Sequence, residues 1–166
     1  NWTAFQPLTA GELYDMARTL TPEAMAAEVV CRGPWADPDL EGAFTVSWEG
    51  DGLLLQFTTE DAWDRAVSVN RLASDGLLLL ALYPQLREVR AWSPDGRSYT
   101  WVTSETAERS LPEGMTIGDC GASPEAFAAL VELLAANAPA STREEPFTDI
   151  LGYDGVLVTV TTLYAW

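Results

Sequence analysis

The chain has 166 residues, among which there is no histidine and no lysine. Without histidine, neither a Ser-His-Asp nor a Cys-His arrangement can form, and catalytic zinc sites built from histidine are excluded. Without lysine, the chain has no amine for a Schiff base and no lysine for a phosphate-binding P-loop. Carboxylates, arginine and aromatic side chains are therefore the functional groups that remain.

Positive charge is scarce. Nine basic residues, all arginine, accompany 25 acidic residues, and the formal net charge is -16. Such a charge repels phosphate backbones and anionic lipid headgroups, so we expect no nucleic-acid partner and no electrostatic docking to a membrane. Cationic partners remain compatible with it. The length and the 48% hydrophobic content indicate one folded domain.

Long apolar runs and cysteines are also few. The longest apolar stretch, Leu77–Leu82, is far shorter than the ~20 residues that cross a bilayer. No signal-peptide pattern follows Asn1, so we expect the native start, with any signal or anchor, to lie upstream of this sequence. Cys31 and Cys120 match no metal or redox spacing, and the sequence leaves open a disulfide or two separate buried thiols. We expect no cofactor.

Capping residues and apolar periodicity predict helices, and alternating apolar residues predict strands. The predicted helices cover Thr9–Arg18, Pro22–Val30, Asn70–Leu82, with Gly76 as a weak point, and the segment that opens at Ser123. The predicted hairpins pair Ala43–Trp48 with Gly52–Thr59 and Glu88–Ser93 with Ser98–Ser104, and a last strand lies near Gly155–Tyr164.

These elements predict an α+β fold, with an antiparallel sheet built from hairpins and helices packed mainly on one face. We expect a single domain over residues 1–166. It would comprise a helical N-terminal part (1–40), an α+β core (43–137) and a linker with a C-terminal strand (138–166).

Two groups of acidic residues are candidates for chemistry. Glu60, Asp61 and Asp64 follow the first hairpin, and paired carboxyl groups can cleave glycosides without other residue types. Acids at this point also suit a helix start. Asp37, Asp39 and Glu41 resemble the first half of a calcium-binding EF-hand loop, but the twelfth position is Trp48, where a bidentate glutamate is required. We therefore predict an acidic surface loop and no metal site there.

The tryptophans Trp48, Trp92 and Trp101 lie on predicted strands. They would stack on a sugar or a peptide if they shared an open face of the sheet, whereas otherwise they would serve in sheet packing. Two carboxyl groups about 5–10 Å apart across a cleft would favour a hydrolase. A shallow aromatic face without such a pair would favour a binding domain.

The segment from about Phe44 to Leu134 contains GLLLQFTTED, NRLASDGLLLLALYPQLREVRAW and SYTW. In these stretches it resembles a bacterial family of unknown function, numbered 4825, whose members look like extracytoplasmic lipoprotein or sensor domains. The resemblance implies a non-catalytic domain that binds a protein or small ligand outside the cytoplasm, tethered to the membrane through an N-terminal segment. It implies no catalytic residues. The alternative function is a carboxylate-based hydrolase that acts on glycans, and a third possibility is a purely structural or inhibitory module within a larger polypeptide.

Overall fold

The computed structural model describes residues 5–67, 71–136, 139–148 and 154–163. The helices are α1 (Ala10–Ala17), α2 (Pro22–Arg32), the 3-10 helix η1 (Pro38–Leu40), α3 (Glu60–Val67), α4 (Arg71–Leu82), α5 (Ser104–Ser110), α6 (Ile117–Cys120) and α7 (Pro124–Ala136). The strands are β1 (Phe44–Glu49), β2 (Gly52–Phe57), β3 (Glu88–Trp92), β4 (Ser98–Thr103), β5 (Pro139–Thr148) and β6 (Asp154–Leu163).

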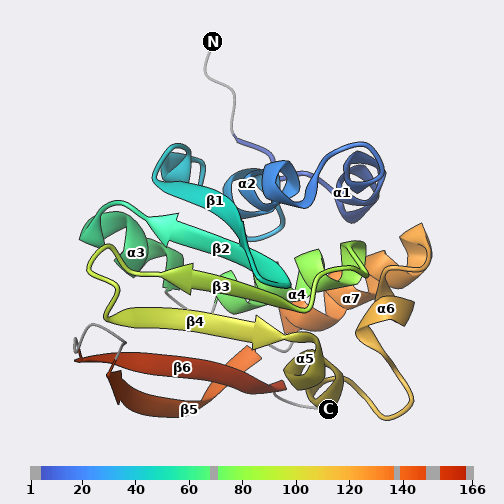
Figure 1. The fold of residues 1–166 in the computed structure, drawn as a ribbon. Coiled ribbons are helices and arrows are strands. Elements are labelled where there is room, and N and C mark those ends of the chain that lie inside the picture. Colours follow the sequence, from blue (N-terminus) through green and yellow to red (C-terminus); the bar gives the residue numbers. More distant parts are fainter. Residues whose placement is uncertain (1–4, 68–70, 137–138, 149–153, 164–166) are drawn as a thin grey trace.

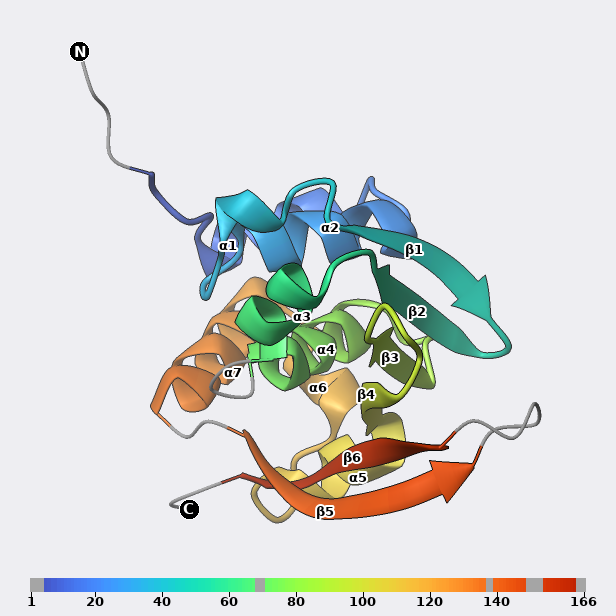
Figure 2. The ribbon, with the colours of Figure 1, turned by 90° about the vertical axis from the view of Figure 1, so that its left-hand side faces the viewer.

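The strands form one sheet in the order β1-β2-β3-β4-β6-β5. Helices α3, α4 and α7 lie on one side of it (Figures 1 and 2). The α+β class and both predicted hairpins are confirmed, since β1 pairs with β2 and β3 with β4 in antiparallel register. The prediction of a purely antiparallel sheet is wrong, because β2–β3 and β4–β6 are parallel pairs. Helices α3 and α4 form the crossover that returns the chain from β2 to the parallel strand β3.

The predicted linker after residue 138 is also corrected by the structure. Residues 139–148 form β5, which pairs antiparallel with β6 from Pro139 opposite Leu163 to Thr148 opposite Asp154. Its polar, proline-containing sequence indicated a linker, but an edge strand tolerates proline because only one side of it must donate to the sheet. The predicted last strand is confirmed as β6, while Tyr164 lies outside the described residues.

Local capping explains where the predicted helices begin. Thr9 and Glu12 form a capping box, with the Glu12 backbone N–H donating to Thr9 Oγ1 at 3.1 Å. Ser123 accepts from the Ala126 backbone N–H at 3.1 Å at the start of α7. The predicted helix after Asn70 is described from Arg71 onward, since Asn70 itself lies outside the described residues. Helices α5 and α6 were not predicted, and of α3 only the start near Glu60 was considered.

Helix α4 is the centre of the core. All residues from Leu72 to Ala81 are buried, and the helix contacts α2, α3, α6, α7, β3 and β4. The inner face of the sheet meets it with Leu55 of β2, Val89 of β3 and Val102 of β4, among other buried side chains. Because the helix is apolar on nearly every side, the surrounding elements must enclose it completely.

Two glycines mark where other elements approach α4 most closely. A Cβ atom at Gly76 would lie 3.4 Å from Val102 Cγ2 and 3.6 Å from Val89 Cβ, which is ordinary van der Waals contact. A Cβ atom at Gly121, just after α6, would overlap the backbone carbonyl of Ala81. Gly76 therefore leaves room for a methyl group, whereas Gly121 is required for α6 to pack on α4.

We predict opposite effects for alanine at these two sites. Gly76→Ala should raise the free energy of unfolding by about 0.5–1 kcal/mol, because alanine is the better helix former and fits the space. Gly121→Ala should lower it by about 1–3 kcal/mol through overpacking. Urea unfolding midpoints at constant m-value would measure both changes. A destabilised Gly76→Ala, or an unaffected Gly121→Ala, would contradict the packing described.

Candidate functional site

The three acids proposed as catalytic candidates lie on the first two turns of α3. Glu60, Asp61 and Asp64 are all exposed, and Glu60 and Asp61 occupy the first turn. There the negative charges of Glu60 and Asp61 interact favourably with the positive end of the helix dipole. None of the three lines the pockets described below. Their position fits the stabilisation of a helix start, which the sequence offered as the other interpretation.

The acidic loop is held by arginine. Asp37 accepts from the Asp39 backbone N–H at 3.1 Å, and Arg65 Nη2 of α3 lies 2.7 Å from Asp37 Oδ2 and 3.1 Å from Asp39 Oδ2. Arg71 Nη1 lies 3.8 Å from the same Asp37 oxygen, while Glu41 is exposed. Among the described residues, no group of three or more acids and cysteines is arranged to hold a metal ion. The loop is an ion-paired connection to α3.

The three tryptophans do not share an open face. Strand alternation places Trp92 and Trp101 opposite their buried neighbours Ala91 and Val102, on the face away from α4. Trp48 lies on the other face, since its direct cross-strand partner Leu53 is buried in the core.

Two of the tryptophans, Trp48 and Trp101, donate side-chain hydrogen bonds to glutamates. Trp48 Nε1 donates to Glu23 Oε1 of α2 at 2.6 Å, which fastens that helix to β1. Trp101 Nε1 donates to Glu88 Oε2 at 2.8 Å, and the other Glu88 oxygen lies 3.4 Å from Arg90 Nε. Trp92 and Trp101 are half-buried on the outer face, whereas Trp48 is 41% exposed on the other face, so the three tryptophans form no shared aromatic platform.

Asp75 on α4, which the sequence did not single out, is the one buried acid among the residues whose burial the structure describes. It is 2% exposed, and neither carboxyl oxygen has a hydrogen-bond partner within the described residues. Burial raises the pKa of Asp75 well above its ordinary 3.8, while Arg71 one turn earlier acts in the opposite direction. The only sign of this buried acid in the sequence is that a single aspartate interrupts the apolar run LASDGLLLLAL.

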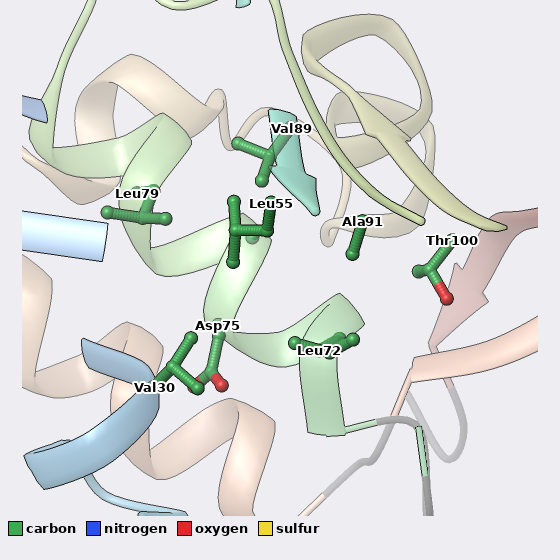
Figure 3. A pocket seen from close by; sticks show the side chains of 9 residues that line it. Val30, Leu55, Leu72, Asp75, Leu79, Val89, Ala91 and Thr100 are labelled. Carbon is green, nitrogen blue, oxygen red and sulfur yellow. The ribbon is translucent and has the colours of Figure 1, made fainter. Parts of the chain in front are cut away.

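Asp75 borders a small cavity between α2, α4 and the sheet. The cavity measures about 10 Å³, close to the least volume that holds one water molecule. Figure 3 shows Asp75 beside Val30; the other lining residues are Leu55, Leu72, Gly76, Leu79, Val89, Ala91 and Thr100. A substrate cannot enter a space of this size, so Asp75 is a buried core acid rather than a member of a catalytic cleft.

The two cysteines are separate buried thiols. Cys31 on α2 and Cys120 on α6 are both free. Burial, with a further contribution from the charge of Glu41, raises the pKa of Cys31 to about 11, and burial also raises the pKa of Cys120. Both thiols are therefore protonated at neutral pH and are poor nucleophiles.

An apolar groove of about 350 Å³ lies between α6, α7 and the segment before α6. We call it the α6–α7 groove; its lining residues are Pro112, Met115, Asp119, Cys120, Ala126, Ala129, Leu130 and Leu133. Met115 is 36% exposed, among the most exposed large apolar side chains described. Because the side chains of Ala126 and Ala129 are small, they do not fill the space between α7 and the opposing wall of the groove. The sequence did not indicate this site, because its walls meet only when α6 folds beside α7.

A third pocket, of about 240 Å³, is more polar. It is lined by Leu80, Pro84, Leu86, Arg87, Ser104, Glu108, Ile117 and Gly118. Each of the three pockets has one carboxylate among its lining residues: Asp75, Asp119 and Glu108, respectively. A glycosidase needs two carboxyl groups that face the same bond. None of these pockets supplies such a pair.

Comparisons of the chain with protein-family models, with curated proteins and with solved structures give no match. Within the described residues, no helix has the length and apolar character needed to span a membrane.

We predict that Asp75→Asn flattens the pH dependence of stability. Because the folded carboxyl group holds its proton to higher pH than the unfolded one, the folded state binds more protons above the ordinary pKa of 3.8. The contribution of Asp75 to stability therefore falls as pH rises from that point, by up to about 1.4 kcal/mol per pH unit. Asparagine cannot ionise, so this contribution vanishes.

Urea unfolding of both proteins at a series of pH values above about 4 would measure the effect. The difference between the two proteins isolates Asp75, since every other acid is common to both. Curves that stay parallel over this range would show that Asp75 keeps an ordinary pKa in the folded state.

Proposed function

We propose that this chain is a non-catalytic binding domain that takes an apolar group of its ligand or partner into the α6–α7 groove. The observation that carries the proposal is the groove itself: about 350 Å³ of mainly apolar space, open to solvent at Met115. Pockets that bind ligands measure about 300–1,000 Å³ and are lined mostly by apolar side chains with a few polar groups. The α6–α7 groove, with Asp119 among its apolar residues, has this character.

The lining of the groove is mainly apolar, so filling the groove with an apolar group is more favourable than leaving it in contact with water. Ala126 and Ala129 lie on α7 and Met115 lies on the opposing segment, so apolar surface faces across the hollow. Covering such surface contributes about 25 cal/mol for each Å² of apolar area removed from water. Methionine is flexible and polarisable, and it adapts to apolar groups of different shape. The site is thus suited to binding rather than to chemistry.

The alternative of a glycan hydrolase has no comparable support. Its candidate acids Glu60, Asp61 and Asp64 are exposed on α3, and the three pockets contain one carboxylate each. The absence of histidine and lysine removes most other catalytic arrangements. We therefore propose no enzymatic activity.

We further propose that the domain works outside the cytoplasm, tethered to a bacterial membrane by a segment upstream of Asn1. This proposal rests on the resemblance of the stretches named above to family 4825, although no family model matches the chain. The net charge of -16 is compatible with it, because a surface that anionic headgroups repel needs a separate anchor.

Filling the groove tests the proposed binding function. The probe is N-phenyl-1-naphthylamine, an uncharged apolar fluorophore whose emission rises when it leaves water. Ala129→Trp should weaken its binding at least about tenfold, because the indole occupies the space between α7 and Met115. Ala129 is exposed, so the substitution should leave the fold intact.

The matched control is Ala135→Trp on the same helix. Ala135 is exposed and follows Ala126 by nine residues, about two and a half turns, so it lies on the opposite side of α7. The control should bind the probe as the wild type does. Equal binding by Ala129→Trp and wild type would place the apolar site elsewhere and contradict the proposal.

A further inference from the structure

The charged residues described in the lining of the α6–α7 groove and beside Ala129 on the surface of α7 are all acidic. Asp119 lines the groove. Glu125 and Glu132 on α7 are exposed; they lie four residues before and three residues after Ala129, which makes them neighbours of Ala129 on the helix surface. Between Leu111 and Ala136 the chain contains no arginine, and its remaining acid, Glu113, adjoins Pro112 of the groove wall.

This charge distribution restricts the occupant. A second copy of the chain would bring another net charge of -16, and anionic lipid would be repelled in the same way. Apolar walls with an acidic rim complement a ligand that carries apolar anchors and positive charge together. The volume of about 350 Å³ suits a few apolar side chains, such as those at positions i and i+3 or i+4 of a short helix.

From this arrangement we infer that the α6–α7 groove binds a basic amphipathic segment of a partner protein. Apolar side chains of that segment enter the groove, and its lysine or arginine side chains pair with Asp119, Glu125 and Glu132 at the rim. The inference rests on the proposed binding function of the groove and adds the class of partner to it.

The first experiment compares three labelled peptides of about 14 residues, roughly four helical turns, by fluorescence anisotropy with the full chain. All carry the same leucine face, and their polar positions are lysine, glutamine or glutamate. The lysine peptide should bind at least about tenfold more tightly than the glutamine peptide, and its advantage should shrink as salt is added. The glutamate peptide should bind least.

The second experiment neutralises the rim. The triple variant Asp119→Asn, Glu125→Gln and Glu132→Gln should weaken the lysine peptide about tenfold, as the loss of three exposed ion pairs would, and leave the glutamine peptide unchanged. The matched control, Glu60→Gln, Asp61→Asn and Asp64→Asn, removes the same charge from α3, which does not line the groove. It should bind as the wild type does, apart from a small general effect of net charge.

The outcomes separate the two proposals. If the lysine and glutamine peptides bind equally, or if the α3 control weakens binding as much as the rim variant does, the basic partner is excluded while the groove stands. Dimers of the free chain that Ala129→Trp disrupts would assign the groove to a second copy instead. If Ala129→Trp and a second groove variant, Met115→Ser, both leave peptide binding unchanged, the groove itself is not the site.

Discussion

Helix α4 is buried on nearly every side, and the arrangement of the other elements follows from the need to cover it. The sheet covers one side with Leu55, Val89 and Val102, while α2, α6 and α7 cover others. Because α4 lies between β2 and β3 in sequence, it also makes these strands parallel neighbours. Close packing at Gly121 then sets α6 against the end of α4, beside α7. The α6–α7 groove is thus a consequence of how the core closes.

The fold could be predicted from sequence wherever the information was local. Capping at Thr9, Thr21 and Ser123 and alternation in the two hairpins placed those helices and strands within a few residues. The mixed sheet could not be predicted in this way, because strand order depends on which distant strands pair. Strand β5 was missed because a polar edge strand has the composition of a linker.

For the candidate sites, too, local sequence patterns were informative, whereas contacts between distant residues could not be predicted. Asp37 and Asp39 looked like metal ligands in sequence, but Arg65, more than twenty residues later, supplies their positive partner. Trp92 and Trp101 do lie on the open face, but contacts such as that between Trp101 and Glu88 tie them into the structure. The groove residues gave no pattern of their own, since alanine and leucine on α7 are also what a core helix presents. The sequence did exclude particular chemistry, because without histidine and lysine the catalytic arrangements that need these residues cannot form.

Burial of Asp75 disfavours its charged form, so ionisation of this group lowers the stability of the core. The exposed acids contribute to the net charge of -16, and those near the groove are the reason why we propose a basic partner. The central claim is that this groove is the binding site. It is tested most directly by backbone amide chemical shifts recorded by NMR while the basic amphipathic peptide is added. We predict that the largest shifts cluster in the segment around Met115 and along α7 at Ala126, Ala129 and Leu133. Shifts centred on the outer face of β3 and β4, or no shifts along α7, would contradict the account.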